Sequence, residues 1–206
     1  HTNRTSCRIQ KTITNLPLFR IINTFRRKIL ESEYLDFLVT PLSRSLEKWP
    51  GILLIDTTTN CNARCIWCLN PHLRTPKGVM KWAVFEKIVK DYASRPGHVN
   101  IGTFGEPLLD PYITKRIEYI RAFNTMDRIG LTTNAYFLDE DKARLFIDNK
   151  VSLEISLDEL EEKKFENIKK MKFEPVIKNI KKLLSLNDRT KKSIQINFRV
   201  KTMGKA

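Results

Sequence analysis

Short runs of apolar residues alternate with amphipathic stretches along the chain from residue 51 onward. The apolar runs, each of which predicts a buried strand, lie at residues 52–56, 98–104, 128–134, 151–158 and 193–200. Between them apolar residues recur at helical spacing, as in Phe85, Ile88, Val89 and Tyr92. Strands that alternate with helices predict a parallel α/β sheet with right-handed crossovers, either an open doubly wound sheet or part of a barrel.

Three further helices complete this pattern. In the first, Asp110 and Pro111 supply the cap and first turn, and Ile113, Ile117 and Ile120 form the buried face. The other two are predicted over residues 139–148 and 174–186. No G-x-G-x-x-G follows the first strand, which argues against a dinucleotide-binding fold.

Basic residues dominate the charge, with 37 Lys and Arg against 23 Asp and Glu and a formal net charge of +14. Much of the excess lies between Lys163 and Lys192, where lysines alternate with acidic and apolar residues as on a solvated helix face. This distribution favours a solvated surface over one that binds nucleic acid or an acidic membrane. Residues 1–50 predict a basic helical segment, separate from a domain over residues 51–206, that could touch either partner.

No run approaches the length of an apolar membrane span, and the first residues lack the features of a signal peptide. We therefore expect a cytoplasmic protein. Because the chain starts with His and stops just after a strand-like run, we also expect it to be a fragment. Four cysteines do not make a disulfide scaffold at this length, and clustered thiols in a reducing compartment indicate metal or redox chemistry.

Three of these cysteines, Cys61, Cys65 and Cys68, follow the first predicted strand with the spacing C-x3-C-x2-C, and none follows downstream. Three thiolates suit a four-iron cluster, because one iron then stays open to a small chelating ligand. The alternative is a structural Cys3His zinc site that uses His72 as its fourth ligand. The fourth cysteine, Cys7, lies far away in the basic segment and is interpreted as a free thiol.

Polar residues also follow the other predicted strands. The second strand runs into Thr103–Pro107, the third into Thr132–Asn134, and the fourth ends near Ser156 and Asp158. The carboxyl ends of parallel strands meet at one edge of the sheet, so we expect these groups to converge with the cysteines. A zinc site alone would not explain them, although each one taken singly could be a cap or turn former.

The cysteine motif and the strand-end motifs are similar to those of a known family. The segment CNARCIWC, with Trp67 before the last cysteine, is similar to the C-x3-C-x-Φ-C signature of the radical S-adenosylmethionine (radical SAM) superfamily. The likeness continues through FGEPLLDP, LTTNA and ISLD and covers roughly residues 51–203. Phe104 departs from it, because many members have glycine there. Beyond ISLD the chain most resembles the branch that often carries a C-terminal SPASM or Twitch extension, which this sequence lacks.

The resemblance implies a partial (β/α)6 barrel of the TIM type, with five of its six strands present. It also implies a [4Fe-4S] cluster, S-adenosylmethionine (SAM) and a one-electron reductant such as a flavodoxin or ferredoxin. Reductive cleavage of SAM would give a 5'-deoxyadenosyl radical that takes hydrogen from a substrate, with a peptide or protein slightly favoured. Without the sixth strand, the edge of the last strand would lie open, so we expect the isolated chain to aggregate or be marginally stable.

The same resemblance assigns roles to residues. Cys61, Cys65 and Cys68 would hold the cluster. The SAM-binding residues would be Gly105, Glu106, Pro107, Thr133, Asn134, Ser156 and Asp158. Within this set Glu106 suits the ammonium group of SAM, while the hydroxyl, amide and carboxylate groups suit its ribose and carboxylate. On the last strand Asn197 and Arg199 alternate with apolar residues, so they would face the barrel interior.

Overall fold

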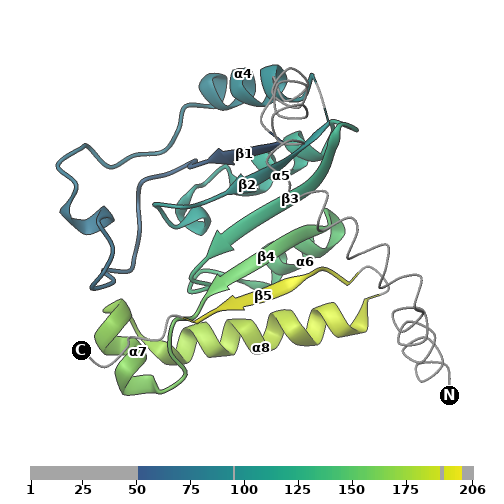
Figure 1. Cartoon of the computed structure of the whole chain (residues 1–206). Coiled ribbons are helices and arrows are strands. Elements are labelled where there is room, and N and C mark those ends of the chain that lie inside the picture. The colour runs from purple at the N-terminus through teal and green to yellow at the C-terminus, as the bar shows by residue number, and fades with distance from the viewer. Residues whose placement is uncertain (1–50, 95, 191–192, 201–206) are drawn as a thin grey trace, which may run out of the picture. The chain divides into compact units, whose positions relative to one another are not determined.

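Five parallel strands form a single sheet in the computed structural model, which describes residues 51–94, 96–190 and 193–200 (Figure 1). The strands are β1 (Ile52–Ile55), β2 (Gly97–Ile101), β3 (Met126–Thr133), β4 (Val151–Ser156) and β5 (Ile196–Arg199). Each strand pairs with the next along the chain, in the order β1-β2-β3-β4-β5. The predicted α/β class with five strands of a partial barrel is therefore confirmed. The predicted helical segment 1–50 and Cys7 lie outside the described residues.

Helices and short 3-10 turns connect these strands. They are η1 (Asn70–His72), α4 (Trp82–Tyr92), η2 (Pro107–Leu109), α5 (Ile113–Arg121), α6 (Glu140–Asp148), α7 (Glu162–Lys169) and α8 (Phe173–Arg189). Figure 1 shows α5, α6 and α8 along one face of the sheet. In the described part of the chain no helix is long and apolar enough to cross a bilayer.

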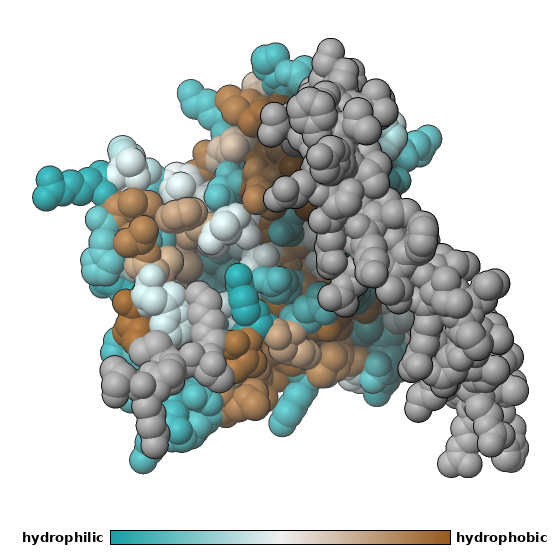
Figure 2. Space-filling view, viewed as in Figure 1, coloured by the Kyte–Doolittle hydropathy of each residue, from teal (hydrophilic) through white to brown (hydrophobic). Residues whose placement is uncertain are grey.

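The core lies between the sheet and these helices. Alternate strand residues such as Val99, Ile129 and Leu153 are buried, and Ile117 and Phe146 of the helices are buried as well. Because strand side chains alternate between faces, the residues between them in sequence lie on the other face. That face carries polar side chains, among them Asn100, Ser152 and Glu154. In Figure 2 hydrophobic and hydrophilic residues are intermixed on the side turned to the viewer.

The prediction of a buried first strand is wrong for half of its residues. Ile52 is 55% exposed and Leu54 63% exposed, whereas Ile55 is buried. β1 lies at one edge of the sheet. Ile52 and Leu54 lie on the same face of the sheet as Asn100 and line a cavity with it, whereas the buried core is on the other face. At the opposite edge, no strand of the described residues pairs with the outer side of β5, where Phe198 is exposed.

The helix after β2 begins later than predicted. Its first residue is Ile113, and Asp110 instead accepts a hydrogen bond from the Tyr112 backbone N–H at 2.9 Å. The other carboxylate oxygen of Asp110 binds Arg116 Nε at 2.7 Å. Arg116 is fully buried with its guanidinium over the Phe85 ring, 4.6 Å from the centroid. Ile113, Ile117 and Ile120 are buried as predicted, so this helix buries an ion pair beside its apolar face.

We predict that Arg116→Met lowers the free energy of unfolding by about 3–5 kcal/mol, because the Asp110 carboxylate then stays buried without its cation. The matched control is Arg144→Met, which removes the same charge from an exposed pair with Glu140 and should cost less than about 1 kcal/mol. Urea denaturation of both variants measures the difference. Equal small losses would show that the buried pair does not stabilise the helix.

Candidate functional site

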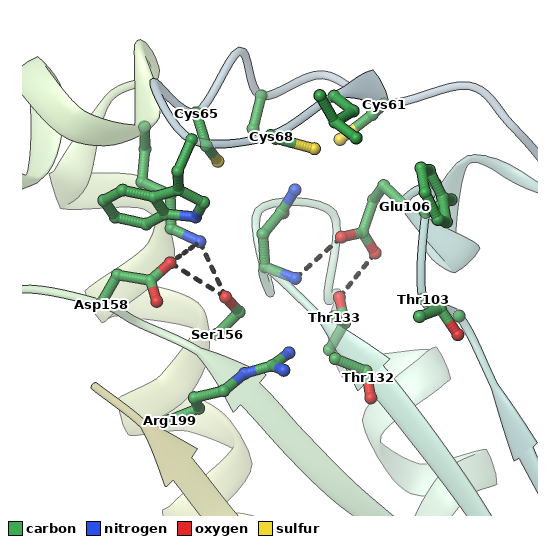
Figure 3. A pocket seen from close by; sticks show the side chains of 18 residues that line it. Cys61, Cys65, Cys68, Thr103, Glu106, Thr132, Thr133, Ser156, Asp158 and Arg199 are labelled. Carbon is green, nitrogen blue, oxygen red and sulfur yellow. Dashed lines mark hydrogen bonds and ion pairs between the residues drawn. The ribbon is translucent and has the colours of Figure 1, made fainter. Parts of the chain in front are cut away.

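A cavity of about 320 Å³ opens at the carboxyl edge of the sheet, between the segment after β1 and the ends of the other strands (Figure 3). It is lined by the predicted residues Cys61, Cys65, Cys68, Gly105, Glu106, Thr133, Asn134, Ser156 and Asp158. Pro107 is the one predicted residue that does not line it, because it is buried in the first position of η2. Residues from four different loops therefore meet at one place, as the sequence predicts.

The segment of residues 57–70, here called the cysteine loop, forms one wall of this cavity. In Figure 3 the sulfur atoms of Cys61, Cys65 and Cys68 all point into it. Burial raises the pKa of the Cys61 thiol to about 11, and burial also raises that of Cys65. Burial thus makes the thiols of Cys61 and Cys65 hold their protons more tightly, and iron would have to displace those protons.

The end of α7 holds the cysteine loop in place. The backbone N–H of Arg64 donates to the Lys169 carbonyl at 2.9 Å, and that of Ile66 donates to the Ile168 carbonyl at 3.0 Å. The last carbonyls of a helix lack partners within the helix, so they are free to accept such bonds. The middle of the loop, around Cys65, is thus attached to the segment that follows β4.

The loop after β2 packs directly against the start of the cysteine loop. The Glu106 backbone N–H donates to the Asn60 carbonyl at 2.8 Å. A Cβ at Gly105 would overlap the carbonyl oxygen of Thr58, so only glycine allows this approach. The sequence analysis names Gly105 as a SAM-binding residue; in the structure its missing side chain makes room for the backbone of Thr58. Asp56 also stabilises the loop after β2, because its carboxylate accepts a hydrogen bond from the Thr103 backbone N–H at 2.6 Å.

Glu106 is a buried carboxylate, 2% exposed, with three donors from the protein. Oε1 accepts from the Thr133 hydroxyl at 2.6 Å and the Leu108 N–H at 3.1 Å, and Oε2 accepts from the Asn134 N–H at 2.7 Å. Burial raises its pKa, while these hydrogen bonds oppose the shift. It has no ion pair within the described residues. Glu106 is thus a cap of η2 and also a buried charge that lacks a cation.

The side chains of Thr133 and Asn134 form hydrogen bonds with other protein side chains. Thr133 binds Glu106, and the Asn134 side chain donates to Asn62 Oδ1 at 2.9 Å. Sequence reasoning did not select Asn62 or Asn70. The Asn70 amide donates to the Thr59 carbonyl at 3.0 Å and the Phe104 carbonyl at 2.6 Å, which joins the cysteine loop to the loop after β2. The one signal in the sequence that could have pointed to Asn70 is the Asn-Pro dipeptide, which marks a turn.

Near the end of β4, Ser156 and Asp158 share a buried lysine. Lys169 Nζ lies 2.5 Å from Asp158 Oδ2 and 3.0 Å from Ser156 Oγ. The other oxygen, Asp158 Oδ1, is buried and has no hydrogen-bond partner. The sequence placed Lys169 on a solvated face. That is wrong: Lys169 is 2% exposed, because it lies four residues after the buried Phe165, on the same side of α7.

The alternative zinc ligand, His72, is exposed on η1 and does not line the cavity. Among the residues that the structure describes, no three His, Cys, Asp or Glu side chains are grouped closely enough to hold one metal ion. The proposed Cys3His zinc site therefore has no support in this geometry.

Arg199 of β5 does line the cavity, as expected, and pairs with Glu154 at 2.9 Å.

The fold and the site define a parallel α/β half-barrel with a cysteine-lined mouth. A model of the radical SAM superfamily matches residues 55–196. The chain belongs to the radical SAM superfamily, and the resemblance carried by its motifs is confirmed.

Curated relatives are named GTP 3',8-cyclase. That of Clostridium botulinum (strain Okra / Type B1) is 35% identical over 150 residues, which cover 70% of this chain and 46% of the relative. That of Chlorobaculum tepidum is 30% identical over 132 residues, 64% of this chain and 40% of the relative. The chain thus spans about half the length of the curated relatives it matches.

Solved structures share the fold at low sequence identity. SuiB of Streptococcus suis bound to S-adenosylmethionine has a TM-score of 0.62 and 17% identity, covering 95% of this chain and 47% of SuiB. Native anSMEcpe with bound AdoMet and Cp18Cys peptide has a TM-score of 0.56 and 23% identity, covering 72% of this chain and 42% of anSMEcpe. At these identities the likeness shows the fold alone.

We predict that Gly105→Ala destabilises the chain by about 1–3 kcal/mol, because the added methyl group forces the loop after β2 away from Thr58. The control is Gly78→Ala, where a Cβ would meet nothing within 4 Å and the change should be less than about 1 kcal/mol in either direction. Thermal or urea unfolding of both variants measures this. If Gly105→Ala were as stable as the control, the close approach of the two loops would not matter to the fold.

Proposed function

We propose that Cys61, Cys65 and Cys68 hold a [4Fe-4S] cluster, that SAM binds beside it in the same cavity, and that the whole protein is a radical SAM enzyme. The observation that carries the proposal is the convergence of three thiols and a buried, cation-free carboxylate on one cavity. When bound, the reduced cluster supplies the electron that cleaves SAM to a radical able to take hydrogen from a substrate. The electron comes from a one-electron reductant such as a flavodoxin or ferredoxin.

The donor set fits the cluster. Each thiolate of such a cluster holds a different iron, so the three sulfurs need to surround a volume rather than meet at one point. This agrees with thiols that point into a shared cavity without forming a site for a single ion. Three protein ligands leave one iron open to an outside ligand. An oxygen-sensitive cluster also suits the reducing, cytoplasmic compartment that the cysteines predict.

The other walls of the cavity fit SAM. Its volume of about 320 Å³ is at the lower end of the range for small-molecule sites. Glu106 uses three of the roughly four acceptor positions of a carboxylate, which leaves room for one charged donor such as an ammonium group. Asp158 Oδ1, buried and unpartnered, is an acceptor for a hydroxyl donor such as a ribose. A cation at Glu106 would also offset the cost of burying that charge.

The resemblance slightly favours a peptide or protein as the substrate, but the curated relatives are named for GTP. GTP is therefore the first substrate to test, by its consumption together with SAM under anaerobic, reducing conditions. The peptide-bound structural neighbour, at 23% identity, carries no argument about substrate.

We predict that replacing Cys61, Cys65 or Cys68 by Ala abolishes iron loading in anaerobic reconstitution, because two thiolates cannot retain the cluster. Iron and sulfide analysis with a visible spectrum measures it. His72→Ala and Cys7→Ala are the controls and should load iron as the unchanged chain does. Full iron content in any of the three cysteine variants would refute the ligand assignment.

We also predict that Glu106→Gln keeps the cluster but weakens SAM binding by about 1.5–3 kcal/mol, the range for a hydrogen bond to a charged group. Isothermal titration calorimetry on the reconstituted protein measures the affinity. Glu118→Gln makes the same chemical change on the exposed side of α5 and should leave binding unchanged. If the two variants bound SAM with equal affinity, Glu106 would only cap η2 and would not bind SAM.

A further inference from the structure

We propose that Lys169 is a positioning residue that fixes both the cysteine loop and the end of β4, and that its positive charge raises the reduction potential of the cluster. The inference rests on the proposed function, since it concerns the same cavity. It goes beyond that function because no motif in the sequence selects Lys169. Three observations carry it: the side-chain contacts of Lys169, the backbone contacts at the end of α7, and the charges nearby.

The side chain of Lys169 orders the end of β4. Its ammonium pairs with Asp158 Oδ2 at 2.5 Å and donates to Ser156 Oγ at 3.0 Å, and Ser156 in turn donates to Asp158 Oδ2 at 3.0 Å (Figure 3 shows Ser156 and Asp158). Asp158 adopts a left-handed backbone conformation, with φ of 63°. Aspartate adopts this conformation more readily than most residues, and the Asp158 backbone N–H also donates to the Arg199 carbonyl at 3.0 Å. Because Lys169 and Ser156 both bind Oδ2, the free oxygen Oδ1 is left for a ligand.

The backbone of the same residue holds the cysteine loop. The carbonyls of Lys169 and Ile168 accept the N–H groups of Arg64 and Ile66, on either side of Cys65. Lys169 is also the last residue of α7, and Lys170 ends the helix in a left-handed conformation. The position of this helix end therefore sets the position of the loop. A buried ion pair at Lys169 fixes the helix end against β4, and through it the loop.

The charge of Lys169 acts on the same region. The Lys169 side chain lines the same cavity as the sulfur atoms of Cys61, Cys65 and Cys68, so its ammonium lies beside the proposed cluster site. A positive charge that stabilises anions here also favours the more negative, reduced state of a cluster. Lys169 therefore makes the cluster easier to reduce.

Lys169→Met, with Lys170→Met as the matched control, tests both parts. The control removes the same charge one residue further on, from an exposed side chain. In the iron-free chain, hydrogen exchange of the Arg64 and Ile66 amides should be at least about tenfold faster in Lys169→Met, because the unpaired Asp158 opens the end of α7. In the iron-loaded chain, the midpoint potential should become more negative in Lys169→Met. It should stay near that of the unchanged chain in Lys169→Arg and Lys170→Met.

Unchanged amide exchange or an unchanged potential in Lys169→Met would overturn the proposal, because a merely structural lysine would not move the potential. If Lys169→Met alone does not fold, Asp158→Asn with Lys169→Met removes the whole buried pair, and a smaller shift toward negative potential is expected from it, because the opposing charge of Asp158 is lost as well. If the unchanged chain takes up no iron, the proposed function fails. The exchange measurement on the iron-free chain then still decides whether Lys169 positions the loop.

Discussion

The site depends on the hydrogen bonds that hold the buried carboxylate of Glu106. A buried charge is costly unless hydrogen bonds or an opposite charge compensate it. Here the donors come from Leu108 of η2 and from Thr133 and Asn134 at the end of β3. Because all three bind one side chain, the loop after β2 is fixed to the end of the neighbouring strand. Among the described residues Glu106 has no cation paired with it, and a positively charged ligand in the cavity would supply that partner.

The cysteine loop is held by contacts from three directions. Asn62 binds Asn134 after β3, Asn70 binds the loop after β2, and the N–H groups beside Cys65 bind the end of α7. None of these contacts uses a cysteine side chain. The thiols are therefore placed by backbone and amide groups and remain available for iron, so that the sheet determines where the cluster would lie relative to Glu106 and Asp158.

Much of this arrangement could be predicted from the sequence, because the signals are local. The alternation of apolar residues located all five strands, and the cysteine spacing with the strand-end motifs located the cavity. The two buried cations could not be found in this way. In the sequence, Arg116 and Lys169 resemble surface residues of basic helices. Their burial is compensated by ion pairs with Asp110 and Asp158, and helical periodicity does not identify these partners. The exposure of Ile52 and Leu54 was missed because an apolar run does not show which face of a strand packs on the core.

The central claim is that one cavity holds both the cluster and SAM. Electron paramagnetic resonance of the reduced, reconstituted chain tests it directly, recorded before and after one equivalent of SAM is added. If SAM binds the open iron, the spectrum of the cluster must change on addition, and an equal amount of adenosine must leave it unchanged. A cluster signal that is the same with and without SAM would show that the two do not share this site, and would contradict the account.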